Sequence, residues 1–170
     1  KEMIATRKES YYKSLFQQCS RMMMTLNKIP QPVIARVHGI ATAAGCQLVG
    51  ACDLAVASED ARFATSGINV GLFCSTPSVP VSRNIPRKQA MELLLTGEFI
   101  DANTALKWGL INRISTLDKL DEEVQKLADA ILSKSSVAVF TGKKMFYKQL
   151  EKNMEDAYAF AGEIMACNMM

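Results

Sequence analysis

The stretch of sequence that decides the fold runs Pro32-Val33-Ile34-Ala35-Arg36-Val37-His38-Gly39-Ile40-Ala41-Thr42-Ala43-Ala44-Gly45-Cys46-Gln47-Leu48. Its β-branched residues at 33–38 predict a buried strand, and the small residues at 39–45 predict a turn before a short helix at 46–51. Small side chains let a ligand approach the backbone, and the first N–H groups of a helix lack partners within it. Such a turn can therefore hold a phosphate or a developing oxyanion. Close packing of strand against helix explains the same small residues equally well. The glycine spacing matches neither the dinucleotide fingerprint nor a phosphate loop.

The segments on either side predict an α/β core with a helical C-terminal layer. Apolar residues recur at steps of three and four over 8–28, which predicts an amphipathic helix that ends before Pro30. Residues 53–57 and 62–64 predict two further strands, and 110–115 a last short one. From Pro86 onward the chain is expected to be mostly helical, with helices over 86–97, 101–109, 117–132, 137–150 and 154–170. The chain has no repeat or linker, so residues 1–170 are expected to form a single domain.

The amino-acid composition excludes several classes of protein. The chain has 170 residues, of which 49% are hydrophobic and 22% charged. These values exclude a disordered chain and a small disulfide-stapled module. The net charge of +3 is too small to indicate a nucleic-acid partner, although it suits an anionic small ligand. Nothing approaches the roughly 18 consecutive apolar residues of a membrane-spanning helix.

Cysteine and histidine usage argues against a metal centre. The five cysteines, an odd number, include no Cys-x-x-Cys pair, and His38 is the only histidine. We therefore expect no metal site and a reducing compartment.

Several motifs resemble one known family. The stretch from Pro32 to Leu48, continued by residues 52–57, resembles the signature of the crotonase (enoyl-CoA hydratase/isomerase) superfamily. Further matches to the family pattern are Phe63, Gly71-Leu72, Met91-Glu92-Leu93-Leu94-Leu95-Thr96-Gly97, Ala105 and Trp108-Gly109-Leu110-Ile111. The strings Ala41–Leu48 and Gly71–Pro77 are similar to those of its enoyl-CoA hydratase domain-containing protein 3 branch.

The resemblance implies a crotonase-like spiral of ββα turns whose C-terminal helices form a homotrimer or hexamer. The implied ligand of this fatty-acid-metabolism family is an acyl-CoA thioester, with no cofactor, whose carbonyl sits between two backbone N–H groups. One of those groups maps to Ala44, and Lys1 resembles a family lysine close to the CoA. Lys1-Glu2-Met3 resembles the end of a family string, so we expect the strands with the second N–H before Lys1 and a terminal helix after Met170. The implied location is cytoplasmic in a bacterium and mitochondrial in a eukaryote.

The chain departs from the family at the acid–base pair. Family hydratases use two glutamates, to activate water and to protonate the α-carbon, and their positions map to Gln47 and Gly67. Gln47 can orient a water but has no titratable proton near neutral pH, and Gly67 can do neither. A well-placed acid or base contributes roughly 10²–10⁴-fold, and an oxyanion donor around 10²–10³-fold. We therefore expect acyl-CoA binding with weak or absent lyase activity. Simple isomerisation is also unsupported, because the single carboxylate of family isomerases lies at or near the Gly67 position. Gln47→Glu with Gly67→Glu is expected to raise the hydratase rate if the geometry is preserved.

Other groups near these positions leave alternatives open. Cys74 and Ser75 map next to the reacting carbons and are candidate nucleophiles, although Cys74 is also explained as a small buried hydrophobe. Thr65, Ser66 and Asn69 can supply neutral hydrogen bonds, which would change the substrate without restoring hydration. His38 is expected to be a satisfied structural histidine, and Asp53 a capping or buried-network residue. The alternative functions are a non-catalytic acyl-CoA-binding or regulatory protein, another crotonase-type reaction such as decarboxylation, and a hydrolase.

Overall fold

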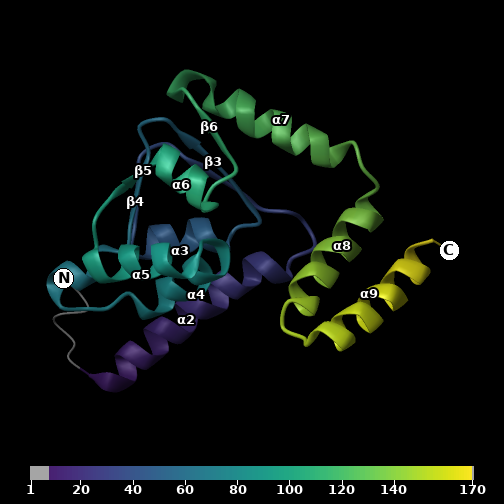
Figure 1. The fold of residues 1–170 in the computed structure, drawn as a ribbon, viewed down its shortest axis with the longest axis horizontal. Helices are drawn as coiled ribbons and strands as arrows, with labels where there is room; N and C mark the ends of the chain where they lie inside the picture. The colour runs from purple at the N-terminus through teal and green to yellow at the C-terminus, as the bar shows by residue number, and fades with distance from the viewer. Residues whose placement is uncertain (1–7, 170) are drawn as a thin grey trace.

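The computed structural model describes residues 8–169, which form two small three-stranded sheets flanked by helices (Figure 1). The first sheet has the order β1 (Ile34–Val37), β3 (Leu54–Ser58) and β6 (Arg113–Ser115), all parallel. The second has the order β2 (Ile40–Thr42), β4 (Arg62–Ala64) and β5 (Ile100–Asp101), with β2 parallel and β5 antiparallel to β4. Each of the first two strand pairs therefore places one strand in each sheet before the chain enters a helical segment.

Helices surround the sheets and continue beyond them. The α-helices are α2 (Glu9–Lys28), α3 (Ala44–Ala51), α4 (Ser75–Asn84), α5 (Arg87–Thr96), α6 (Ala102–Trp108), α7 (Leu120–Leu132), α8 (Ser136–Gln149) and α9 (Met154–Asn168). Two short 3-10 helices are η1 (Ser66–Val70) and η2 (Leu117–Lys119). Among the described residues, no helix combines the length and apolar character needed to cross a membrane.

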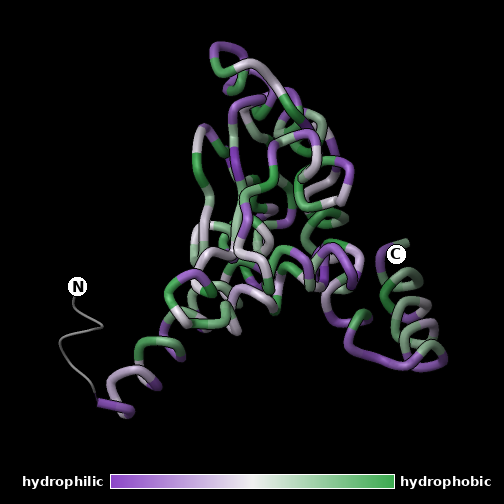
Figure 2. Tube along the Cα trace, turned by 60° about the vertical axis from the view of Figure 1, so that its left-hand side comes forward, coloured by the Kyte–Doolittle hydropathy of each residue, from purple (hydrophilic) through white to green (hydrophobic). Residues whose placement is uncertain are grey.

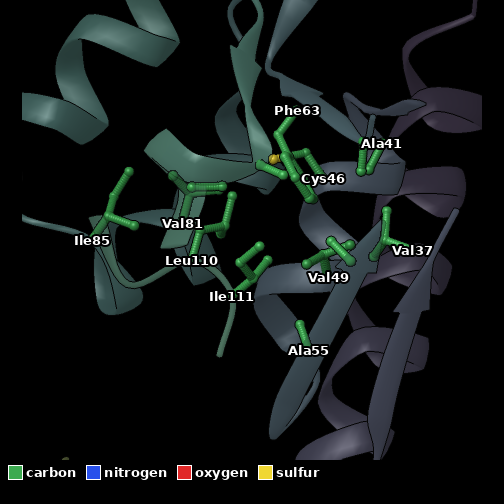
Figure 3. Packing of buried hydrophobic residues seen from close by; sticks show 14 of the residues in the cluster. Val37, Ala41, Cys46, Val49, Ala55, Phe63, Val81, Ile85, Leu110 and Ile111 are labelled. Atoms are coloured by element: carbon green, nitrogen blue, oxygen red, sulfur yellow. The ribbon is translucent and has the colours of Figure 1, made fainter. Parts of the chain in front are cut away.

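The hydrophobic core lies where β3 and β4 meet α3, α4 and α5 (Figure 3). Cys46, Phe63 and Val81 are fully buried there, and Leu110 and Ile111 belong to the same cluster. Gly50 lets α4 approach α3 closely, because a Cβ at this position would already lie 3.4 Å from Cβ of Pro80.

The last three helices differ in how they contact the core. Helix α7 packs against β1, β3 and β6, and only its Leu120 is buried. Helices α8 and α9 form a hairpin that stands away from the body of the molecule (Figures 1 and 2), with α8 touching α2. The expected stripe over 117–132 is thus only partly buried, since Leu117 and Leu132 are 54% and 75% exposed.

The structure corrects the prediction of a turn at 39–45. Residues 40–42 form β2, whose register pairs Thr42 with Ala64, and α3 begins at Ala44, two residues earlier than predicted. The N–H of Ala43 donates to the carbonyl of Ala64 (3.0 Å), and Ala43 adopts a left-handed φ of 48°, so the chain passes from strand to helix within one residue.

The chain is mostly helical from Pro86 onward, as predicted, but α4 comes before this point and is not among the predicted helices. Pro77 lies in the first turn of α4, where proline is tolerated, and Pro80 lies inside the helix with its ring against Gly50. Later signals are confirmed: Gly97 ends α5 with φ 65°, and the Asp101 carboxylate caps α6 by accepting from Thr104 N at 2.7 Å. Of the strand expected at 110–115, only Arg113–Ser115 pairs.

Candidate functional site

The predicted site residues cluster at the carboxyl ends of two neighbouring parallel strands. Strand β2 leads through Ala43 into α3, and β4 leads through Thr65 into η1, so Ala44 and Gly67 leave the sheet at the same edge. In open α/β sheets, ligands bind outside this edge of the strands. The topology therefore brings together the two segments that the sequence singles out.

Ala44 is the first residue of α3 and is exposed. The first helical hydrogen bond runs from Gln47 N to Ala43 O (3.0 Å), so the N–H of Ala44 precedes the bonded part of the helix. The φ of 48° and ψ of −114° at Ala43 are costly for a residue with a Cβ. This strained residue fixes where the first N–H groups of α3 point.

Gln47 lies about one turn further along α3, and the residue is only 3% exposed. Its Oε1 accepts from the Cys19 thiol of α2 at 3.9 Å, a long contact. A neutral amide at this depth can orient a partner by hydrogen bonds but cannot accept a proton near neutral pH.

Gly67 is packed from two sides by the segment that follows η1. A Cβ built on Gly67 would lie 2.6 Å from the carbonyl oxygen of Leu72 and 2.8 Å from Sγ of Cys74. The Leu72 N–H also donates to Gly67 O (3.0 Å). The Cys74 thiol and this loop therefore fill the space that the first atoms of any side chain at position 67 would need.

Cys46 of α3 and Cys74, which precedes α4, are both buried. Burial raises the pKa of the Cys46 thiol to about 12, and the nearby Cys74 thiol adds to the effect, so Cys46 stays protonated at neutral pH. Cys74 is 6% exposed and precedes the first turn of α4, whereas Ser75 is exposed, with its hydroxyl 3.4 Å from Phe73 O.

His38 follows β1 and Asp53 precedes β3, so neither comes from the segments that follow β2 and β4. His38 is exposed, and its expected structural role stays a prediction. Asp53 accepts from Val33 N (2.6 Å), Lys143 Nζ (2.6 Å) and Tyr147 OH (2.7 Å), which confirms it as a buried-network residue. Lys1 lies outside the described residues. Within residues 8–169, no group of three or more histidine, cysteine, aspartate or glutamate side chains is placed to hold a metal ion.

The uncharged polar residues that follow β4 make different hydrogen bonds. Thr65 is fully buried and its hydroxyl donates to Leu93 O (2.7 Å), while Asn69 Nδ2 donates to Gly97 O (3.4 Å). Ser66 instead meets Thr42, with their hydroxyl oxygens 2.7 Å apart. Thr42 is absent from the sequence-based candidates, because its pairing depends on the register of β2 and β4.

Comparison with known proteins identifies the family. Residues 1–167 match the family model described as enoyl-CoA hydratase/isomerase. The chain belongs to the enoyl-CoA hydratase/isomerase family. It is 47% identical over 169 residues to the rat (Rattus norvegicus) "Enoyl-CoA hydratase domain-containing protein 3, mitochondrial", covering 99% of this chain and 56% of the rat protein. The chain thus spans little more than half of that relative's length.

Solved structures of enoyl-CoA hydratase relatives share the fold. The crystal structure of an enoyl-CoA hydratase from Mycobacterium smegmatis is similar with a TM-score of 0.98 and 56% identity, covering 99% of this chain and 66% of that chain. The human enoyl-CoA hydratase domain-containing protein 3 gives a TM-score of 0.92 and 48% identity, covering 96% and 64%. The expected α/β crotonase-like fold and the resemblance to this branch are confirmed. The roles assigned to Ala44, Gln47, Gly67, Cys74 and Ser75 stay predictions.

Proposed function

We propose that this member of the enoyl-CoA hydratase/isomerase family binds an acyl-CoA thioester at the carboxyl ends of β2 and β4. The thioester oxygen accepts a hydrogen bond from the N–H of Ala44. The observation that carries the proposal is the position of this N–H, at the exposed first residue of α3, directly after the strained Ala43. The positive end of a helix favours the negative charge that develops on such an oxygen.

We further propose that hydration of enoyl thioesters is weak or absent. Gln47 provides a neutral amide, and at Gly67 the loop to Cys74 takes the place of a side chain. Each missing acid or base removes roughly 10²–10⁴-fold in rate. A thioester held on Ala44 is therefore polarised without a group that activates water.

Calorimetric titration of the full-length protein tests the binding. Butyryl-CoA is compared with butyl-CoA, the thioether that lacks the carbonyl, with no cofactor or metal added because we propose that binding needs none. Since one neutral hydrogen bond is worth about 0.5–1.5 kcal/mol, the thioester should bind about 3- to 10-fold more tightly. Equal affinities would contradict the contact with Ala44, and failure of both ligands to bind would overturn the proposed function.

A matched pair of variants tests whether the N–H of Ala44 is the group that binds the thioester oxygen. Replacing the Ala44 peptide bond by an ester, with the α-hydroxy acid analogue of alanine, removes the N–H at the first position of α3, and the same replacement at Ala102 removes the N–H at the first position of α6. We expect only the ester at position 44 to abolish the preference for thioester over thioether. A thermal melt of each variant confirms that it folds.

Turnover is tested with crotonyl-CoA by following the absorbance of its conjugated thioester. The full-length protein should show negligible loss of the band. Rapid loss would show that another group activates water, and the assignment of Gln47 and Gly67 as disabled positions would fail.

We also propose an oligomeric state and a cellular location. The apolar side chains on the α8–α9 hairpin support assembly into a homotrimer or hexamer, because Phe146, Leu150 and Met154 are 51%, 58% and 73% exposed. The name of the rat relative supports a mitochondrial location in a eukaryote, and the free cysteines of the described residues are compatible with a reducing compartment. Cell fractionation tests the location.

A further inference from the structure

Two asparagine side chains hold the carboxyl end of α3. Asn84 Nδ2 of α4 donates to Gly50 O (2.8 Å) and to Pro80 O (2.7 Å). Asn27 Nδ2 of α2 donates to Ala51 O (3.0 Å). An amide nitrogen carries two hydrogens, so the Asn84 side chain can bond one carbonyl of α3 and one of α4 at the same time. The end of α3 is therefore tied to both neighbouring helices.

These amides complete the hydrogen bonding of the last turn of α3. A helix leaves its last four carbonyl groups without partners inside it, and in α3 these belong to residues 48–51. The N–H of Cys52 donates to Leu48 O (3.1 Å) and Val49 O (3.3 Å), and the two asparagines bond the other two carbonyls. Both of those carbonyls belong to buried residues, so losing either amide destabilises the last turn.

The opposite end of α3 is held in a different way. Its N-cap residue, Ala43, has no side-chain oxygen that could accept from the first N–H groups. Ala43 also has a strained backbone with φ 48°, and such a conformation persists only where the surrounding structure enforces it. One constraint comes from the sheet, since the N–H of Ala43 donates to Ala64 O (3.0 Å). The asparagines supply a second constraint, from the other end of the helix.

The helix is short enough for one end to control the other. Helix α3 has eight residues, which corresponds to a length of about 12 Å. Because α4 packs closely on Gly50, the bonds from Asn84 fix how α3 lies along α4. If α3 slides or tilts against α4, its first N–H groups move with it. The asparagines therefore influence where the N–H of Ala44 points.

We propose that Asn27 and Asn84 are positioning residues for the thioester site, because they hold α3 so that the N–H of Ala44 meets the carbonyl oxygen of the ligand. This inference rests on the proposed function. The two amides bond the end of α3 opposite Ala44, so they act through the helix and not on the ligand. Without them, the part of the affinity that depends on the thioester oxygen is lost, while contacts with the rest of the ligand are kept.

Calorimetric titration of the full-length protein with butyryl-CoA and with its thioether, butyl-CoA, tests the inference. Wild type should prefer the thioester about 3- to 10-fold, as one neutral hydrogen bond provides. In the double variant Asn27→Ala with Asn84→Ala we expect this preference to fall below about twofold, while the affinity for butyl-CoA changes less than about twofold. Each single variant should give an intermediate preference, and a thermal melt of every variant identifies those that fold.

The matched control is Asn112→Ala. The Asn112 side chain also bonds the backbone, since its Oδ1 accepts from Ala55 N (2.8 Å), but this partner lies in β3 and not in α3. The control variant should melt at a lower temperature and keep the preference for the thioester. A merely structural role for Asn27 and Asn84 would give the same result in their variants.

The outcomes separate this inference from the proposed function. A thioester preference that stays at the wild-type value in the single variants overturns the positioning role alone. A preference that is lost equally in Asn112→Ala also overturns it, because any loss of stability would then suffice. Equal affinities of wild type for the two ligands, or binding of neither, overturn the proposed contact with Ala44 and the positioning role together.

Discussion

Gly67 shows how the absence of one side chain shapes the site. Its neighbours, the Leu72 carbonyl and the Cys74 thiol, stand 2.6 and 2.8 Å from where a Cβ would be. Contacts that short force the neighbours to move, and one of them is backbone. The expectation that glutamates at positions 47 and 67 raise the hydratase rate therefore needs revision, because the required geometry at 67 is not preserved.

Gly67→Ala tests this directly. We expect the variant to lose about 1–3 kcal/mol of unfolding free energy, the usual cost of overpacking a well-filled site, and Gly67→Glu to lose at least as much without gaining hydratase activity. Urea unfolding of the full-length protein measures the change. Gly142→Ala is the control, because a Cβ there meets nothing within 4 Å, and it should gain about 0.5–1 kcal/mol as alanine replaces a helical glycine. Equal stability of the Gly67→Ala variant and wild type would contradict the crowding.

Lys143 ties helix α8 to the core through a buried polar network. Its ammonium donates to the Asp53 carboxylate (2.6 Å), to Leu26 O (2.7 Å) and to Gln31 O (2.8 Å). The side chains of Lys143 and Asp53 are only 6% and 13% exposed. One residue of α8 thus joins the end of α2, the loop before β1 and the start of β3.

Removing Lys143 should be costly. Lys143→Met leaves the Asp53 carboxylate buried without its cation, and breaking such a pair typically costs about 3–5 kcal/mol. The neighbouring Lys144→Met is a matched control, since Lys144 is exposed and surface changes stay within about 0.5 kcal/mol. Urea unfolding of both full-length variants measures the difference. Similar stabilities for the two variants would mean that the pair does not anchor α8.

Tyr147 adds a pH dependence to the same network. Burial, together with the hydrogen bond to Asp53, raises the pKa of the Tyr147 hydroxyl above its usual range. The folded protein therefore keeps this proton at a pH where the unfolded chain releases it. The contribution is complete below the ordinary tyrosine value of about 10 and is lost as the pH rises beyond it.

Tyr147→Phe should reveal that loss. The stability advantage of wild type over the variant is expected to be constant between about pH 7 and 9 and to shrink from about pH 10 upward. Urea unfolding at a series of pH values gives both curves. An advantage that grows with alkaline pH would contradict the sign of the shift.

The sequence predicts an element well when neighbouring residues determine it, and poorly when contacts between distant segments determine it. The cap of α6 is local, since Asp101 and Thr104 are three residues apart, and it is predicted correctly. Helix α4 contains Pro77 and Pro80, which argue against a helix until the close packing of Pro80 on Gly50 is known. Strand β2 has three residues, and only its pairing with β4 marks it as a strand.

In the candidate site too, features determined by neighbouring residues are predicted and long-range contacts are not. The local pattern of small residues predicts a helix start close to the observed one, at Cys46 instead of Ala44, and Ala44 itself is singled out by the resemblance to the family. The contact of Thr42 with Ser66, and that of Cys74 with the Gly67 position, join segments whose alignment is set by strand register and loop packing. No periodicity or spacing along the chain encodes those contacts.

Among residues 8–169, helix α9 exposes a row of large, mostly apolar side chains. The α8–α9 hairpin stands apart from the sheets (Figures 1 and 2). Met154, Tyr158 and Met165 on α9 are 73%, 74% and 70% exposed. Steps of four and seven residues place these three side chains on one helix face. Apolar surface of this extent is typical of a contact between subunits.

Charges on that face should separate the subunits. Tyr158→Glu with Met165→Glu places two carboxylates where apolar contacts are expected, so we predict that the full-length wild type elutes with a trimeric or hexameric mass and this variant with a smaller one. Light scattering coupled to size-exclusion chromatography measures both masses. Glu163→Gln is the control, because Glu163 is exposed on the opposite side of α9 and should leave the mass unchanged. A monomeric wild type would contradict the assembly, and an unchanged mass in the double variant would place the contact on another surface.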